Sequence, residues 1–222
     1  MLQHLIISLF SYYFLLLAII NLPLNAQTSG NVRSVILAKE QAYTHIEQLK
    51  DGILLVRLQS KHKNIAAYKA AGYHATAQKV ANDQLKHNQH IVKIFKANFD
   101  FCPIYFFYAK DTDKLYDPNT SIFLDDQLNY APTISPSGQT FYIAEMTALK
   151  DSDLLEESGD NKPKNYHVNT TLQRVIVIKD AQLQQLSAPF PFYIKTTFDQ
   201  FAAQKVDKWN KRLHLFYDKS QR

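Results

Sequence analysis

A proline-free segment with helical periodicity, Lys63–Asn98, separates two short apolar runs and constrains the fold more than any other feature. The two runs, Ile53–Leu58 and Ile104–Tyr108, are rich in aliphatic and aromatic residues and are bounded by turn residues or proline, which is typical of buried strands. Within the helical segment, apolar side chains recur on one broad side. Gly72 interrupts this pattern, so the segment is either one bent helix or two helices.

Further runs along the chain have the composition of strands or the periodicity of helices. The strand-like runs are Ser121–Leu124, Thr140–Glu145, Arg174–Asp180 and Pro189–Ile194, of which the last suits a sheet edge. The helical segments are Val35–Lys50 and Thr197–Tyr217. Because the later strands follow one another closely, part of the sheet should be antiparallel. The sequence therefore predicts a single α/β domain with a mixed, partly antiparallel sheet of about five strands, a long helical segment and a C-terminal helix.

An uncharged apolar run, Leu5–Ile20, precedes this pattern. Ala26 follows a few residues later and supplies the small side chain that signal peptidase requires before its cut. The run is shorter than the about 20 apolar residues that a membrane-spanning helix needs. We therefore predict a signal peptide over residues 1–26 and a mature domain over residues 27–222, exported to the periplasm or secreted. Residues 27–34 are polar, and we expect a loose arm there.

An uncleaved N-terminal helix that anchors the chain is the alternative to a cleaved leader. The residues before the apolar run include no lysine or arginine, and Leu24, two residues before Ala26, is larger than the small residue usually found at that position. The mature chain contains no other segment that indicates a transmembrane span.

Composition and charge limit the classes of partner. Hydrophobic residues make up 46% and charged residues 20% of the chain, which is typical of a globular domain. Only 5 glycines are present, which disfavours folds built on Gly-rich phosphate loops. The net charge is +5, but acids alternate with the basic residues, as in Lys205–Arg212. This pattern indicates a solvated helix face, so we expect no nucleic-acid partner and only weak attraction to anionic envelope surfaces.

Cys102 is the only cysteine, so an intramolecular disulfide is impossible. It lies within Phe99–Phe107, the most apolar stretch of the mature chain, where a buried thiol behaves as a small hydrophobic side chain. The alternative is a thiol-dependent, thioredoxin-like redox protein that uses Cys102. The second cysteine of such proteins is missing, and only the segment Val175–Ile194 loosely resembles their closing hairpin, which carries no evidence of function.

His87 and His90 are three residues apart on the predicted long helix, so their imidazoles could share one metal ion. A third ligand from His45, His62, His74 or an acid would have to be brought in by the fold. A histidine on the apolar side of a helix is more often a core or boundary residue. We therefore expect no metal and no other cofactor, with a metal-dependent hydrolase that uses His87 and His90 as the alternative.

Acidic and serine-containing loops give no specific catalytic signature. The loop Asp111–Asn119 is similar to a calcium-binding loop, but apolar residues occupy positions that should hold ligands and glycine, so we interpret it as a solvated loop. The segment Ser135–Gly138 is a turn rather than a nucleophile elbow. Strand-end carboxylates either converge at one sheet edge or are solvated turn residues, and we favour the second interpretation. These carboxylates are Asp125, Asp126, Glu145 and Asp180.

Three segments together resemble a group of uncharacterised exported proteins of Bacteroidetes-type bacteria. The segments are Asn25-Ala26-Gln27, Phe99-x-Phe-Cys-Pro-x-Tyr-Phe-Phe107 and Pro189-Phe-Pro-Phe-Tyr193. The resemblance covers most of the mature chain, implies export, and implies no activity and no catalytic residue. With no catalytic motif in the sequence, the best prediction is an exported, non-catalytic envelope domain that binds a ligand or partner of unknown kind.

Overall fold

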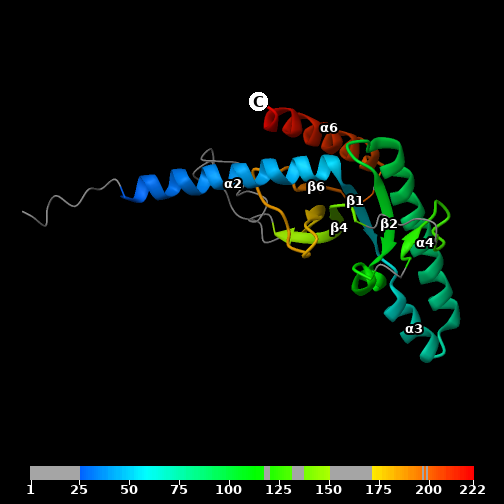
Figure 1. Ribbon diagram of the computed structural model, residues 1–222. Helices are drawn as coiled ribbons and strands as arrows, with labels where there is room; N and C mark the ends of the chain where they lie inside the picture. The colour runs from blue at the N-terminus through cyan, green and yellow to red at the C-terminus, as the bar shows by residue number, and fades with distance from the viewer. Residues whose placement is uncertain (1–25, 118–120, 132–137, 151–171, 197, 199) are drawn as a thin grey trace, which may run out of the picture. The chain divides into compact units, whose positions relative to one another are not determined.

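Six strands form one mixed sheet in the order β3-β2-β1-β4-β5-β6 (Figure 1). The computed structural model describes residues 26–117, 121–131, 138–150, 172–196, 198 and 200–222. The strands are β1 (Ile53–Leu58), β2 (Ile104–Tyr108), β3 (Phe123–Leu124), β4 (Phe141–Lys150), β5 (Leu172–Lys179) and β6 (Tyr193–Lys195). β1 lies parallel to both β2 and β4, whereas β3, β5 and β6 join the sheet antiparallel to their neighbours. The predicted α/β class and partly antiparallel sheet are confirmed, with six strands where about five were expected.

The chain divides into two compact units, Met1–Lys39 and Glu40–Arg222. The described part of the first unit is the beginning of helix α2 (Ala26–Asp51), where Val35, Ile36 and Leu37 are exposed. Residues 27–34 belong to this helix, so the prediction of a loose arm was wrong. The single glycine in this stretch costs a helix only about 1 kcal/mol relative to alanine, so the helix extends through the polar residues. The sheet and all features below lie in the second unit.

Three helices cover one face of the sheet, and this face holds the main core (Figure 1). α4 (His74–Asn98) and α6 (Ala202–Ser220) pack there with the part of α2 that belongs to the second unit. Leu54, Val56 and Leu58 of β1 face this core, while Ile53 and Leu55 belong to a smaller cluster on the other face. Burial on both faces explains why β1 is a continuous apolar run in the sequence.

The long helical segment forms two helices, which decides between the two alternatives that the sequence left open. α3 (His62–Ala70) and α4 are separated by a turn in which Gly72 adopts a φ of 80°. This left-handed conformation is readily available only to glycine and ends α3. None of the residues of α3 is buried, so the helix lies along α4 without entering the core.

Other predicted boundaries shift near the C-terminus. The predicted edge strand Pro189–Ile194 is confirmed at the sheet edge as β6, but β6 begins only at Tyr193. The last helix was predicted from Thr197 and begins at Ala202. Phe198 has a φ of 55°, which is incompatible with a right-handed helix and explains the later start. None of the helices among the described residues is both long and apolar enough to span a membrane.

Candidate functional site

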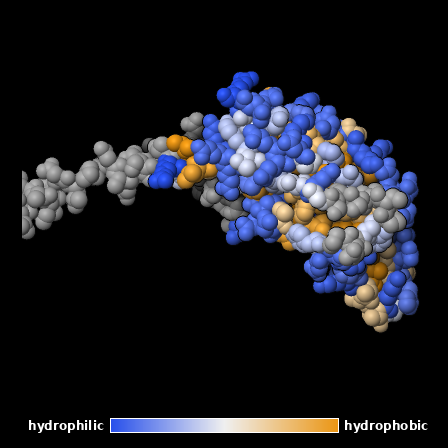
Figure 2. Space-filling model, in the orientation of Figure 1, coloured by the Kyte–Doolittle hydropathy of each residue, from blue (hydrophilic) through white to orange (hydrophobic). Residues whose placement is uncertain are grey.

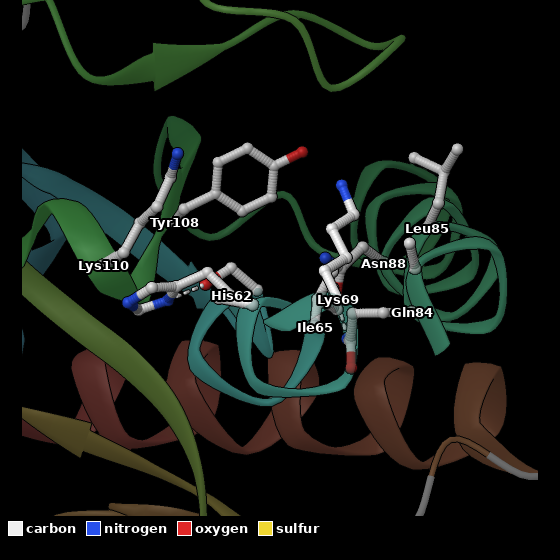
Figure 3. A pocket seen from close by; sticks show the side chains of 11 residues that line it. His62, Ile65, Lys69, Gln84, Leu85, Asn88, Tyr108 and Lys110 are labelled. Carbon is white, nitrogen blue, oxygen red and sulfur yellow. Dashed lines mark hydrogen bonds between the residues drawn. The ribbon is translucent and has the colours of Figure 1, made fainter. Parts of the chain in front are cut away.

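The carboxyl ends of β1 and β2 lie beside each other, because the strands are parallel and Leu58 pairs with Tyr108. The chain continues from β1 into α3 and from β2 into the short 3-10 helix η1 (Ala109–Lys114). A pocket of about 440 Å³ opens between these segments and α4 (Figure 3). This edge pocket is lined by Ser60, His62, Ile65, Ala66, Lys69, Ala81, Gln84, Leu85, Asn88, Tyr108 and Lys110. Its volume falls within the range of about 300–1,000 Å³ that small-molecule sites occupy.

The charged groups of the edge pocket are all basic. Lys69 and Lys110 contribute ammonium groups and His62 an imidazole, and no aspartate or glutamate is present among the described lining residues. The Lys69 ammonium makes no hydrogen bond or ion pair with a described residue. Figure 3 shows the Lys69 and Tyr108 side chains extending into the space between Lys110 on one side and Leu85 on the other. The pocket therefore presents positive charge that its own lining does not neutralise.

Two tyrosine rings hold Lys110 in place. Its ammonium nitrogen lies 5.7 Å from the ring centre of Tyr108 and 5.4 Å from that of Tyr130, within cation–π range. A side-chain hydrogen bond with Tyr130 is the main cause that raises the pKa of Lys110. Lys110 thus keeps its charge in the neutral pH range and loses part of its conformational freedom before any ligand arrives.

The residue that follows Lys110, Asp111, has a buried carboxylate. Asp111 is 4% exposed, and its Oδ2 accepts a hydrogen bond of 2.6 Å from the Tyr130 hydroxyl. Its Oδ1 lies 3.3 Å from the Lys114 ammonium. Asp111 therefore balances part of the charge of Lys110, whereas Lys69 forms no ion pair with any acidic residue that the structure describes.

Two buried amides fix the position of α4 at the pocket. Gln84 Nε2 donates to Asn88 Oδ1 at 2.9 Å, and Asn88 Nδ2 donates to the carbonyl oxygen of Gln59 at 2.8 Å. Gln59 directly follows β1, so this chain of hydrogen bonds connects α4 to the end of the central strand. Because a buried amide without a partner is costly, the pair sets the distance between the helix and the strand.

Apolar side chains from α3 and α4 form the remaining wall. Ile65 and Ala66 come from α3, and Ala81 and Leu85 come from α4. Leu85 is 42% exposed, although it lies on the same helix as the core residue Phe95. Figure 2 shows apolar surface at the end of the molecule where α3 lies, bordered by hydrophilic residues. The edge pocket therefore combines an apolar wall with basic groups.

A smaller pocket of about 210 Å³ adjoins the first and shares Ser60, His62 and Lys110 with it. Lys61 and Lys63 also line it, so the basic character continues along this edge. Ser60 Oγ lies 2.9 Å from His62 Nδ1, which fixes one nitrogen of the imidazole.

Comparisons with family models, with curated proteins and with solved structures gave no match. The physical properties of the site therefore carry the functional argument.

Cys102 lies in the main core, and the prediction of a buried thiol is confirmed. Burial raises the pKa of this thiol to about 12, so its nucleophilic thiolate form is scarce at neutral pH. This position gives no support to the redox alternative.

The histidines do not gather around a common point. His87 packs against the ring of Phe198 at 5.8 Å and His90 is exposed. Burial lowers the pKa of His87, and the charges of His90, Lys61 and Arg174 lower it further. His45 is hydrogen-bonded to the Tyr142 hydroxyl, His62 lines the edge pocket and His74 is exposed. Within the described part of the chain, no three His, Cys, Asp or Glu side chains are placed to share a metal ion.

The strand-end carboxylates do not converge. Asp125 and Asp180 each accept hydrogen bonds from two backbone N–H groups of the turn that follows, which confirms the turn interpretation for both. Asp126 is exposed and pairs with Lys96. Glu145 lies within β4, where its carboxylate oxygens are 2.7 Å from Arg57 and 2.8 Å from Lys179. Glu145 is therefore the centre of an ion-pair cluster on the sheet and does not reach the edge pocket.

The acidic loop Asp111–Asn119 is only partly as predicted. Asp111 and Thr112 are buried, so the interpretation as a solvated loop was wrong for its first residues. The reason is that Tyr130 binds Asp111 and the Arg57 Nε donates to Thr112 Oγ1 at 3.0 Å. The end of this loop, the turn at residues 135–137, the predicted leader up to residue 25 and the segment 151–171 lie outside the described residues.

Sequence reasoning missed the principal pocket residues, Lys69, Tyr108 and Lys110. A single lysine in a polar helix or loop is not distinguishable from any other solvated lysine. The sequence feature that could have located the pocket is the pair of strand-like runs on either side of a helical segment. Two strands joined by a helix are usually parallel, and the residues that follow parallel strands lie at the same edge of the sheet.

Proposed function

We propose that this protein is a non-catalytic domain that binds a small molecule in the edge pocket. The observation that carries the proposal is the position and chemistry of this pocket: it opens at the carboxyl ends of two parallel strands and combines an apolar wall with basic groups. Open α/β sheets usually bind ligands at the carboxyl ends of their strands. A pocket with an apolar lining and a few placed polar groups is the usual form of a small-molecule site.

The lining residues favour binding of a ligand over catalysis of a reaction. Among the described lining residues, Ser60 and His62 form the one contact between a hydroxyl group and an imidazole that could act as a base. A nucleophilic serine also requires a group that orients its base, and no described carboxylate is hydrogen-bonded to His62. The held ammonium of Lys110 and the fixed amides of Gln84 and Asn88 suit recognition of a ligand.

A fragment screen followed by backbone amide NMR shifts tests the proposal. The library is balanced in neutral, cationic and anionic compounds, so that the result does not depend on the charge of the ligand. We expect hits that shift amides of α3, of the first half of α4 and of the loop after β1. Replacement of the lining residue Ala81 by tryptophan should fill the pocket and remove these shifts.

The matched control is Ala75→Trp, which places the same ring at an exposed position of α4 outside the lining. This variant should bind the hits as the unaltered protein does. Hits that map elsewhere, or that bind Ala81→Trp equally well, would contradict the proposal.

We also propose that the protein acts outside the cytoplasm, with residues 1–26 removed on export. Support comes from the apolar leader and from Ala26, and a cut there would fall at the start of α2. Intact mass measurement on the protein recovered from cell fractions tests this. A chain that begins at Gln27 in the periplasm or medium is expected, whereas a full-length chain in the membrane fraction would favour the anchored alternative.

A further inference from the structure

We infer that the edge pocket selects an amphiphilic anion, a small molecule in which one negatively charged group is joined to a short apolar body. This inference rests on the proposed function and assigns its ligand class. It follows from the arrangement of two ammonium groups and four apolar side chains around one pocket, namely Lys69, Lys110, Ile65, Ala66, Ala81 and Leu85.

The apolar wall sets the first requirement. Leu85 remains 42% exposed and Ile65 is only partly buried, so both keep apolar surface in contact with water. Covering this surface with an alkyl or ring group is favourable by about 25 cal/mol for each Å² removed from water. A purely polar ion would leave this surface hydrated and would gain nothing from the wall.

The basic groups set the second requirement. The two ammonium groups belong to different segments, Lys69 to α3 and Lys110 to η1, and both line the same pocket. A cationic ligand would meet like charges, and a neutral ligand could accept hydrogen bonds from them but would gain no attraction between opposite charges. A carboxylate or phosphate can form charge-assisted hydrogen bonds with them, which are roughly twice as strong as neutral ones.

The two requirements together place the ligand. Its charged group lies towards Lys69 and Lys110, and its apolar body lies between α3 and α4 against Ala81 and Leu85. The negative charge of Asp111 is partly offset by the Lys114 ammonium, which lies 3.3 Å from its Oδ1, and Asp111 is not among the described residues that line the pocket. The ordered position of Lys110 between two rings lowers the entropy lost on binding.

Titration calorimetry with four probes on the full chain tests the inference. Octanoate and octyl phosphate carry an anionic group and a tail, octan-1-ol carries the tail alone, and acetate carries the charge alone. We expect octanoate or octyl phosphate to bind at least about tenfold more tightly than octan-1-ol and acetate, and the tighter of the two identifies the preferred head group.

Lys69→Met removes one charge and keeps the apolar stem of the side chain. It should weaken binding of the anionic probe roughly fivefold and leave binding of octan-1-ol unchanged. The matched control is Lys93→Met at an exposed position of α4 outside the lining, which should change neither. Because Lys69 has no described hydrogen-bond or ion-pair partner, its replacement should not disturb folding.

The outcomes separate this inference from the proposed function. If octan-1-ol binds as tightly as the tighter of octanoate and octyl phosphate, or if Lys69→Met behaves as Lys93→Met does, the ligand class assigned here is wrong. Loss of that binding in Ala81→Trp would still support the edge pocket as a small-molecule site. If no probe binds and the fragment screen also gives no hit at the pocket, both the ligand class and the proposed function fail.

Discussion

The two halves of α4 have the same backbone but opposite surroundings. In the second half, Ile91, Val92, Ile94 and Phe95 are buried against the sheet and α6. In the first half Ala77 and Gln84 are the buried residues, and the main neighbour is α3, none of whose residues is buried. The comparison suggests that packing of the second half holds the helix, which leaves the first half free to form the pocket wall.

The packed half should make Cys102 nearly unreactive in the native protein. Cys102 lies in the same core as Phe95, and burial raises the pKa of its thiol from 9.0 to about 12. This shift alone lowers the thiolate fraction at mildly alkaline pH roughly a thousandfold. Labelling with a thiol reagent, followed by mass spectrometry, should therefore be fast only in denaturant. Rapid labelling of the folded chain would contradict this prediction and would revive the redox alternative.

Truncation in the packed half should strongly lower the stability of the domain. Phe95 is fully buried and contacts the rings of Phe99 and Phe106. Phe95→Ala should lower the free energy of unfolding by about 3–5 kcal/mol, because it removes buried apolar surface and leaves a cavity. Urea denaturation followed by circular dichroism measures this. A loss below about 1 kcal/mol would mean that the two halves of α4 do not differ as described.

The contrast between the halves also explains which parts of the fold were predictable. β1 and β2 were predicted with the bounds they have, because each is a continuous apolar run between turn residues. Helical periodicity placed seven apolar residues on one side of the long segment, and three of them, Ile91, Ile94 and Phe95, are core residues. The other four are partly or largely exposed, because α3 and the first half of α4 do not pack against the sheet: Ile65, Tyr68, Tyr73 and Val80. The start of α6 was missed because the positive φ of Phe198 depends on tertiary contacts that local sequence does not encode.

The edge pocket was not predictable in the same way. Lys69 and Lys110 are distant in sequence and come together only through the parallel pairing of β1 and β2. Neither lysine has a pattern around it, and the residues that did show patterns, Cys102 and His87, proved to be packed against apolar groups. Periodicity reports burial, whereas a pocket depends on which segments the topology brings together.

The burial of His87, near the middle of α4, should be visible in the pH dependence of stability. Burial, together with His90, Lys61 and Arg174, lowers the pKa of His87 from 6.5. The folded protein therefore binds this proton less tightly than the unfolded chain, so the free energy of unfolding falls as the pH drops below about 6.5 through the folded pKa. Above about pH 6.5 His87 is neutral in both the folded and the unfolded chain, so its titration no longer changes the free energy of unfolding.

Urea unfolding of the native chain and of His87→Gln at about pH 7 and about pH 5 checks this effect. The variant keeps a polar side chain but cannot gain the proton, so it should lose less stability on acidification. An equal loss in both proteins would contradict the lowered pKa of His87 in the folded state.

Leu85→Ala should have the smallest effect on stability and separates the two halves most directly. It removes a large apolar side chain from the same helix as Phe95→Ala, but Leu85 is 42% exposed, so the free energy of unfolding should change by about 1 kcal/mol or less. Its loss should instead weaken octanoate binding by roughly threefold, since the tail loses part of its apolar wall. Calorimetry and urea denaturation on the same preparation test both effects. If Leu85→Ala destabilised the domain as much as Phe95→Ala, α3 and the first half of α4 would have to be part of the folding core, and the pocket would be a defect in packing rather than a site.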